Sequence, residues 1–316
     1  MKATNILHTF IAVAILLCTG ATAQTAQQDS NIGNIGNIVV HLETAEWGQN
    51  SPYNSLCFTS RGQQAKTGCV PTAYAILCHY HKWPESANEK RVYHSGTGEN
   101  ITLGHAYEYE NMLNSYRGSY TAEQASAVAT LMRDLGWAYQ VNYGTGSTDS
   151  GSGGEGAAKL IDIFKYRSES PNIQSAQYAT VRDVVGNDAL WIEYIKESLD
   201  AGCPIPYSST TTGGGRHIFI LDGYTDNNYF HFNWGWGGQG NGWFKLEAMT
   251  PDAGSNYSSS HRAYFMLKPD RPTDTGIQEN STDNEASTIY DLCGRKVTEI
   301  TTPGIYIING KRQFVR

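Results

Sequence analysis

A cysteine at the expected start of a helix is the residue of this sequence best placed for covalent chemistry. Pro71 fits a first helical turn, because the N–H that proline lacks is not needed there. Cys69 therefore falls at or just before the helix N-terminus, where unpaired N–H groups and the helix dipole stabilise a thiolate. Its own N–H can face a developing oxyanion, and Gly68 would let a substrate approach the backbone closely. The helical spacing of apolar residues continues to near Pro84, through Val70, Ala73, Ile76, Leu77 and Tyr80.

The alternative for Cys69 is a buried structural cysteine, which is how we interpret Cys78 inside the same helix. His79 and His81 point in different directions on that helix, so we expect no metal site there. Once Cys18 is removed with the export signal described below, an odd number of cysteines remains, and at least one thiol must stay free or pair between chains. The remaining cysteines, none of which forms a CxxC pair, are Cys57, Cys69, Cys78, Cys203 and Cys293.

A histidine at the start of an apolar strand is the second chemical feature. The glycine-rich residues 213–215 lead into a strand at His217, and strands at 229–234 and 242–246 complete an antiparallel meander. The hairpin predicts that Asn233 and Trp234 lie beside His217, with Asn233 accepting the imidazole N–H and Trp234 shielding that bond from water. Asp222 is a rival orienting group, but strand alternation puts it on the opposite face. A cysteine and an oriented histidine together are typical of nucleophilic catalysis.

Length, composition and the N-terminal residues limit the class of protein that carries these residues. The chain has 316 residues, 40% of them hydrophobic, enough for a full core, and its formal net charge of −7 argues against nucleic acid as a partner. Residues 1–23 have the basic, apolar and small-residue regions of a signal peptide, and their apolar run is too short to span a bilayer. Lipid attachment at Cys18 is an alternative that Leu17 disfavours. We therefore expect a secreted or cell-surface protein.

The expected domain plan has five parts: signal peptide 1–23, linker 24–38, core domain 39–269, linker 270–287 and a small β module 288–316. Strand-like residues 289–292 and 304–308, with the turn signal Asn309-Gly310, define the module. This tail resembles the C-terminal sorting modules of type IX secretion in Bacteroidetes, which would make it an export signal that is removed or anchored. The alternative is a β appendage that closes the fold.

Several segments together resemble the streptopain family of papain-like cysteine peptidases. They span about 190 residues in the family's order, so the set is far more specific than any one segment. The segments are residues 47–49 with 52–54, residues 67–70, 80–84 and 142–144, His217 with 222–224, and residues 233–238.

The resemblance implies a role for each matched residue. Cys69 is the nucleophile, His217 the general base and Gln49 the oxyanion-hole glutamine, with Asn233 and Trp234 as the pair that orients and shields the histidine. Gln49 could not be found from spacing alone. The Gly- and Ser-rich residues 144–156, which precede a helix expected at 157–166, match a loop that walls the substrate groove in the family.

The resemblance also implies the fold and the reaction. We expect an α+β, two-lobed papain-like domain with a helical lobe and an antiparallel β lobe, and hydrolysis of peptide or protein substrates through a thiolate–imidazolium pair, with no cofactor and no metal. A hydrophobic preference next to the cleaved residue is implied in the same way. Acyl transfer by the same two residues, or binding without catalysis, are the alternatives.

This chain departs from the family in two respects. The family usually has a small residue where this chain has Pro71, which fits the helix start. Only about 20 residues separate Ala23 from Thr44, whereas the family's type member has a long inhibitory prodomain. Control by a separate inhibitor protein, or no such control, is therefore expected.

Overall fold

The structure is a computed structural model that describes residues 35–170, 178–251 and 255–271, together with strand residues 289–290, 296–297, 304–308 and 311–315. The chain divides after Asp270 into two compact units. The expected signal peptide and almost all of linker 270–287 lie outside the described residues, as do linker residues 24–34. Ile38, assigned to the first linker by sequence, is the first residue of strand β1.

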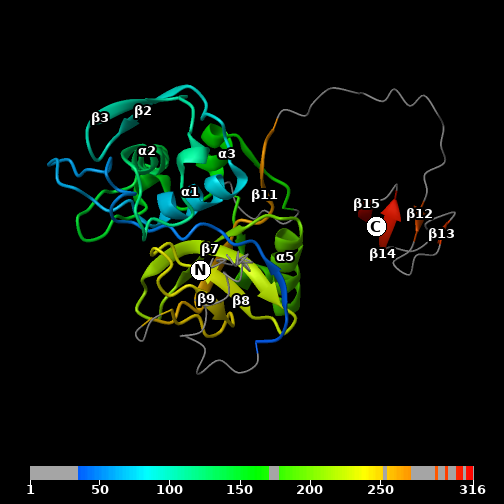
Figure 1. Cartoon of the computed structure of the whole chain (residues 1–316). Helices are drawn as coiled ribbons and strands as arrows, with labels where there is room; N and C mark the ends of the chain where they lie inside the picture. Colours follow the sequence, from blue (N-terminus) through cyan, green and yellow to red (C-terminus); the bar gives the residue numbers. More distant parts are fainter. Residues whose placement is uncertain are drawn as a thin grey trace, which may run out of the picture. The chain divides into compact units, whose positions relative to one another are not determined.

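Helices and one hairpin build the first lobe of the larger unit (Figure 1). Helix α2 begins with a capping box, in which Thr121 and Gln124 exchange side-chain and backbone hydrogen bonds. Helix α1 packs against α2 and supplies the centre of a core that is rich in aromatic side chains. The elements of this lobe are α1 (Cys69–His81), α2 (Ala122–Ala138), α3 (Ala158–Phe164), β2 (Lys90–His94), β3 (Glu99–Leu103), η2 (Tyr109–Asn111) and η3 (Gly151–Gly153).

A seven-stranded antiparallel sheet forms the second lobe, in the order β5-β10-β6-β7-β8-β9, with β1 also paired to β7. Helix α5 contacts β6 and β7. The elements are β1 (Ile38–His41), β5 (Thr180–Val181), α4 (Arg182–Val185), α5 (Asp188–Asp200), β6 (Ile205–Thr210), β7 (Arg216–Thr225), β8 (Phe230–Asn233), β9 (Gly242–Phe244) and β10 (Ser259–Ala263), and β4 (Tyr166–Ser168) pairs separately with β11 (Leu267–Pro269).

Strand β7 lies between two hydrophobic cores and is therefore apolar on both faces. Ile218 and Ile220 belong to the core of the helical lobe, whereas Phe219 and Leu221 belong to the core between the sheet and α5. This alternation explains why the strand reads as a continuous apolar run. It also places the first residues of β7 at the boundary between the lobes.

The smaller unit is a four-stranded antiparallel sheet in the order β13-β12-β14-β15. Its strands are β12 (Ile289–Tyr290), β13 (Lys296–Val297), β14 (Gly304–Ile308) and β15 (Lys311–Val315). The residues predicted to turn between the last two strands, Asn309 and Gly310, lie outside the described residues.

The expected fold class is confirmed, because a helical lobe packs on an antiparallel β lobe to give an α+β domain. The meander of β7, β8 and β9 is also as expected, with slightly different strand ends. No helix in the described part of the chain combines the length and the apolar character needed to cross a bilayer.

Candidate active site

Cys69 is the first residue of α1, with Gly68 as the N-cap, as the sequence predicts. Gly68 has a φ of +92°, and a Cβ at this position would lie 2.8 Å from Cγ2 of Thr148. Thr148 of the 144–156 loop is therefore the residue that packs closely against the Gly68 backbone. Among the described cysteines Cys69 is the one that is not buried, since Cys57, Cys78 and Cys203 are buried free thiols.

His217, the second residue of β7, is buried and oriented by a main-chain group. Its Nε2 lies 2.8 Å from the carbonyl oxygen of Trp234. Because a carbonyl only accepts, Nε2 carries the proton and Nδ1 keeps its lone pair. The Trp236 ring is stacked on the imidazole at 5.0 Å between centroids, and the Trp234 ring is nearly parallel to it at 6.3 Å. The arrangement fixes one tautomer under an aromatic cover.

The expectation that Asn233 orients His217 is wrong. Asn233 is paired with Ile220, and its Nδ2 donates to Oγ1 of Thr44 at 3.0 Å and to the Ala45 carbonyl at 2.8 Å. Its Oδ1 accepts the Gly235 N–H at 3.2 Å. Asn233 therefore shapes the turn that presents the Trp234 carbonyl. Asp222, the rival orienting group, bonds to His231 rather than to His217.

The start of α1 meets the start of β7 at the Cys69 sulfur. The backbone N–H of Ile218, one residue after His217, lies near Sγ and acts to lower the pKa of the thiol, as do the N–H groups of Cys69 and Val70 at the helix start. Burial nevertheless raises the pKa of the Cys69 thiol, and the Glu155 carboxylate adds to this effect. Burial also lowers the pKa of His217 to about 4, with partial opposition from the Trp234 carbonyl. Burial therefore favours the neutral forms of both groups, the opposite direction from the expected thiolate–imidazolium pair.

Glu155 joins the two lobes beside this site. Its Oε1 accepts from the Ser208 hydroxyl at 2.9 Å and pairs with Arg216 at 3.4 Å and Arg262 at 3.5 Å. Its backbone carbonyl accepts the Tyr74 hydroxyl proton at 2.7 Å. Sequence reasoning assigned Glu155 no role, because its partners come from three strands that only the fold brings together.

Gln49 lies beside the segment that leads into α1, since its carbonyl accepts the Thr67 N–H at 3.1 Å. It lines a cavity of about 410 Å³ that also contacts Trp236, the residue stacked on His217. Arg117, which also lines this cavity, donates from Nε and Nη2 to the Gly237 carbonyl at 2.9 and 2.6 Å. The full lining is Gly48, Gln49, Asn50, Ser51, Tyr53, Lys66, Tyr116, Arg117, Trp236, Gly237 and Gln239.

Trp236 is the site residue that the sequence analysis passed over. Its ring stacks on His217, and it lies three residues beyond Asn233, the last residue of β8 that pairs with β7. Counting residue pairs outward from the β7–β8 turn, and allowing for the extra residue at Asp222, could have placed Trp236 near His217.

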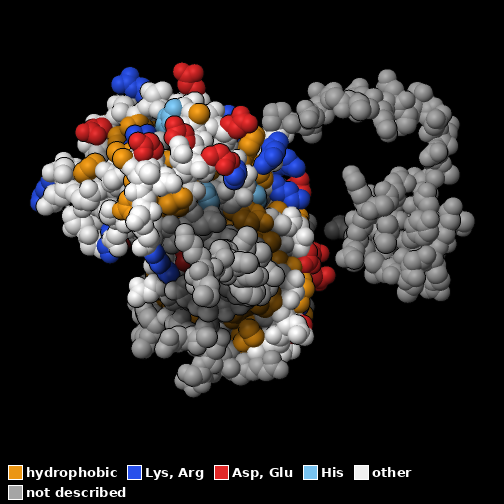
Figure 2. Space-filling view, in the orientation of Figure 1, with side chains coloured by type: hydrophobic (Ala, Val, Ile, Leu, Met, Phe, Trp, Pro, Cys, Tyr) orange, Lys and Arg blue, Asp and Glu red, His pale blue; other side chains and the backbone are white. Residues whose placement is uncertain are grey.

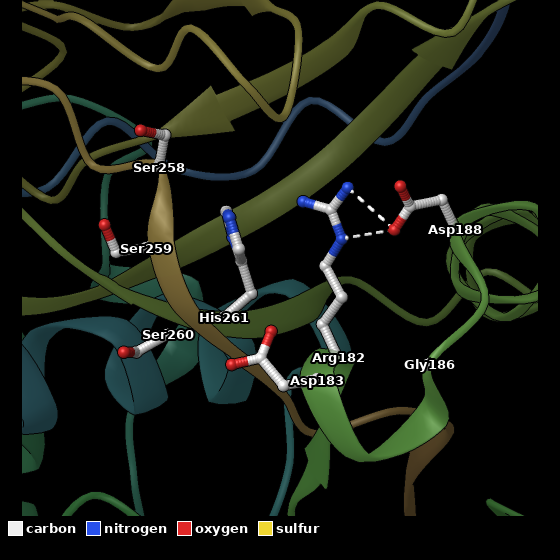
Figure 3. A pocket seen from close by; sticks show the side chains of 8 residues that line it. All are labelled: Arg182, Asp183, Gly186, Asp188, Ser258, Ser259, Ser260 and His261. Atoms are coloured by element: carbon white, nitrogen blue, oxygen red, sulfur yellow. Dashed lines mark hydrogen bonds and ion pairs between the residues drawn. The ribbon is translucent and has the colours of Figure 1, made fainter.

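A larger cavity of about 620 Å³ contains none of the predicted site residues (Figure 3). Arg182 in its wall donates from Nε to Oδ1 of Asp188 at 3.0 Å. Its other lining residues are Asp183, Gly186, Ser258, Ser259, Ser260 and His261. The smaller cavity, which adjoins Gln49 and Trp236, is therefore the one that serves the candidate site.

The surface carries charges of both signs. On the face drawn in Figure 2, basic and acidic side chains are interspersed over the described residues. This mixture agrees with the modest negative net charge of the sequence.

A largely buried cysteine at a helix N-terminus, with a histidine at the start of a strand between a helical and a β lobe, defines the papain-like class of cysteine protease folds. Comparison with solved structures agrees. Active wild-type interpain A cysteine protease of Prevotella intermedia superposes with a TM-score of 0.59 and 27% identity, covering 73% of this chain and 94% of that one.

The chain belongs to the Peptidase C10 family, whose model matches residues 47–244. It is 30% identical over 273 residues to thiol protease/hemagglutinin PrtT of Porphyromonas gingivalis, and 31% identical over 228 residues to streptopain of Streptococcus pyogenes. These alignments cover 79% and 66% of this chain. They span 30% and 54% of the two relatives, which are therefore considerably longer than the matched region.

Proposed function

We propose that this chain is a cysteine endopeptidase that cleaves peptides or proteins. Cys69 is the nucleophile and His217 the general base, while the Gln49 side chain and the Cys69 N–H hold the oxyanion. The Trp234 carbonyl keeps the imidazole proton on Nε2, so that Nδ1 is free to accept the thiol proton. The observation that supports this best is the packing of α1, which begins at Cys69, against β7, which carries His217 as its second residue.

The proposed reaction runs through the expected thiolate–imidazolium pair, formed as the thiol proton passes from Cys69 Sγ to Nδ1 of His217. Sγ attacks the scissile carbonyl carbon, and the imidazolium then protonates the leaving amine. A thioester remains on Cys69. Water attacks it while giving a proton to His217, and the carboxylic acid product leaves as the proton returns to sulfur.

The test compares Cys69→Ala with Cys78→Ala, which removes a buried thiol from the same helix. We expect Cys69→Ala to lower casein cleavage by at least about a thousandfold, and Cys78→Ala to leave most of it. Peptide mapping after treatment with an epoxysuccinyl thiol inhibitor should find the label on Cys69, and His217→Ala should prevent labelling. Cleavage that persists in folded Cys69→Ala would refute the proposal.

A second assay separates hydrolysis from the acyl-transfer alternative. The chain is incubated with a glutamine donor and a labelled primary amine. Peptide cleavage without amine incorporation supports the endopeptidase. Incorporation that depends on Cys69 would instead identify an acyl transferase.

We also propose that the protein is exported, with residues 1–23 as signal peptide, residues 39–269 as the peptidase domain and residues 288–316 as a sorting module. The order of Lys2, the apolar run and the small residues before Gln24 supports the signal peptide. Intact-mass measurement of protein from the culture medium tests this, because removal of both ends leaves a defined mass.

A separate protein inhibitor remains part of this proposal and is tested by pull-down with Cys69→Ala.

A further inference from the structure

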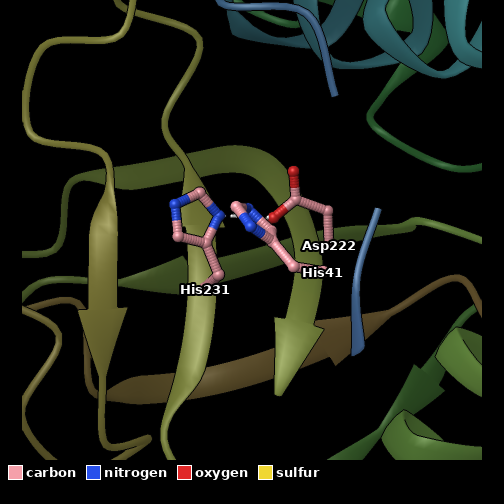
Figure 4. Close-up of side chains that lie close together, drawn as sticks. All are labelled: His41, Asp222 and His231. Atoms are coloured by element: carbon pink, nitrogen blue, oxygen red, sulfur yellow. Dashed lines mark hydrogen bonds and ion pairs between the residues drawn. The ribbon is translucent and has the colours of Figure 1, made fainter. Parts of the chain in front are cut away.

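Three neighbouring strands, β1, β7 and β8, bring two histidines and an aspartate together (Figure 4). His41 of β1 and His231 of β8 are both paired with Gly223 of β7, one from each side. Cross-strand partners project from the same face of a sheet, so the two imidazoles share a face. Their ring centroids are 4.3 Å apart.

Because Gly223 has no side chain, the two imidazoles can approach each other across β7. A Cβ there would lie 3.0 Å from the Trp243 ring and 3.2 Å from Cβ of His231. The β7–β8 pairing changes register between Leu221 and Gly223, which is where Asp222 lies. This bulge lets the Asp222 carboxylate reach a group of residues that regular alternation would keep on the other face.

The buried Asp222 carboxylate is held with one oxygen directed at the histidines. Its Oδ2 accepts the Thr44 N–H at 3.2 Å and the Thr44 hydroxyl at 2.5 Å. Its Oδ1 lies 2.6 Å from Nδ1 of His231. Bonds that fix the second oxygen of a ligating carboxylate are a common feature of metal sites.

We propose that His41, His231 and Asp222 bind one divalent transition-metal ion, for which Zn²⁺ is the natural probe. One ligand atom from each residue lies within 4.8 Å of the others. Ligand atoms around a tetrahedral zinc ion are about 3.4 Å apart, so the exposed His41 ring must move inward and the His231 ring must move slightly away from Asp222 Oδ1, which now lies 2.6 Å from it. The ion replaces the proton that His231 and Asp222 share, and that proton is released to water. The fourth position is open to water.

His105 and Asp134 form a second histidine–aspartate pair, which serves as a comparison. His105 Nε2 lies 3.0 Å from Oδ2 of Asp134, and that carboxylate is completed by the Arg133 guanidinium and the Tyr107 hydroxyl. A cationic arginine at the same carboxylate disfavours a metal ion. Among the described residues, the 41/222/231 trio is the one group of His, Cys, Asp or Glu that meets the spacing for a metal ion.

Metal binding would join the N-terminal strand of the domain to the centre of the sheet. His41 is the last residue of β1, and the ion would link it to β7 and β8 through side chains in addition to the backbone ladder. The Trp243 ring lies edge-on to both histidines, with centroids at 5.4 and 5.2 Å, and covers the site. We therefore expect the ion to raise the thermal stability of the domain.

Calorimetric titration of the untagged Cys69→Ala chain with ZnCl₂ tests the proposal, because this variant lacks the Cys69 thiol, a competing zinc ligand, and cannot cleave itself. We expect one ion per chain, at least tenfold weaker binding in the His41→Ala and His231→Ala variants, and no change in His105→Ala. Co²⁺ should give the visible absorption of a four-coordinate ion in the parent and in His105→Ala, but not in His41→Ala. Zn²⁺ should raise the Tm of the parent and of His105→Ala, but not that of His41→Ala.

The exposed position of His41 keeps the test decisive if His231→Ala does not fold. No Zn²⁺ binding at millimolar concentration would overturn the proposal. So would binding that neither His41→Ala nor a folded His231→Ala weakens. Because all arms lack Cys69, failure here leaves the proposed peptidase activity unaffected.

Discussion

At the residue scale, the group that orients His217 is a main-chain carbonyl, which no substitution at Trp234 removes. Asn233 acts on it indirectly through the turn that it holds with Thr44, Ala45 and Gly235. The arrangement separates two functions that a single side chain could combine. Asn233 contributes to folding, whereas the imidazole tautomer depends on the backbone.

Asn233→Asp tests this separation. Aspartate retains an oxygen for the Gly235 N–H but loses both N–H donors, leaving the Ala45 carbonyl without its partner. We expect the free energy of unfolding to fall by about 1–3 kcal/mol, measured by urea denaturation. The pH profile of kcat/KM should keep its midpoints. A shifted midpoint would mean that the new carboxylate acts on His217 directly.

Gln49→Ala tests the oxyanion role. Loss of one oxyanion donor typically lowers kcat by about 10²–10³, whereas loss of a mere pocket wall raises KM. We expect the first result from steady-state kinetics with a fluorogenic peptide. Gln239→Ala is the matched control, because Gln239 lines the same cavity. Equal effects of the two substitutions would assign Gln49 to substrate binding.

Local pattern predicted Cys69 and His217 as candidates, because the chemistry of each depends on the end of a single element. Gln49 came only from the family resemblance, since its position beside Thr67 depends on the fold. Asn233 was assigned the wrong partner because the hairpin register was not counted from its turn. The Trp234 carbonyl has no side-chain signature in the sequence.

At the element scale, the start of α1 depends on a backbone conformation that only glycine adopts readily. Gly68 combines a φ of +92° with a ψ of 158°. This conformation turns the chain sharply into the helix, and the 144–156 loop packs on it through Thr148. Pro71 predicted where the helix starts, but not the turn that precedes it, because that turn involves a loop about 80 residues away.

Gly68→Ala should therefore cost more than an ordinary helix-cap substitution. Backbone strain and the contact with Thr148 together should lower the free energy of unfolding by about 1–3 kcal/mol. Thr148→Ser removes the methyl group in contact and keeps the hydroxyl bond to Lys66. The double variant should recover part of the loss in urea denaturation. Full recovery would show that packing alone, and not backbone strain, requires glycine.

At the scale of the whole domain, β7 joins the two cores and carries His217 at their boundary. The β meander was predicted from local strand patterns, whereas the two lobes were predicted from the family resemblance. The sequence could not predict that alternate residues of one strand enter different cores. That arrangement depends on which helices cover each face, and it buries several histidines far from solvent.

Two of these buried histidines should make the fold sensitive to acid. Burial lowers the pKa of His217 to about 4 and, with Arg182 nearby, that of His261 to about 4. The unfolded chain takes up these protons near pH 6.5, whereas the folded chain does not. Stability is therefore fully present above pH 6.5 and is lost as the pH falls toward 4, by up to about 3 kcal/mol for each histidine.

Urea denaturation of the Cys69→Ala chain between pH 7.5 and 5 measures this loss. His261→Gln removes one of the two groups without touching the candidate site, and we expect it to reduce the loss by about half. A parent chain as stable at pH 5 as at pH 7.5 would mean that these rings are protonated in the folded state. In that case Nδ1 of His217 could not serve as a base at low pH, and cleavage should decline over the same range.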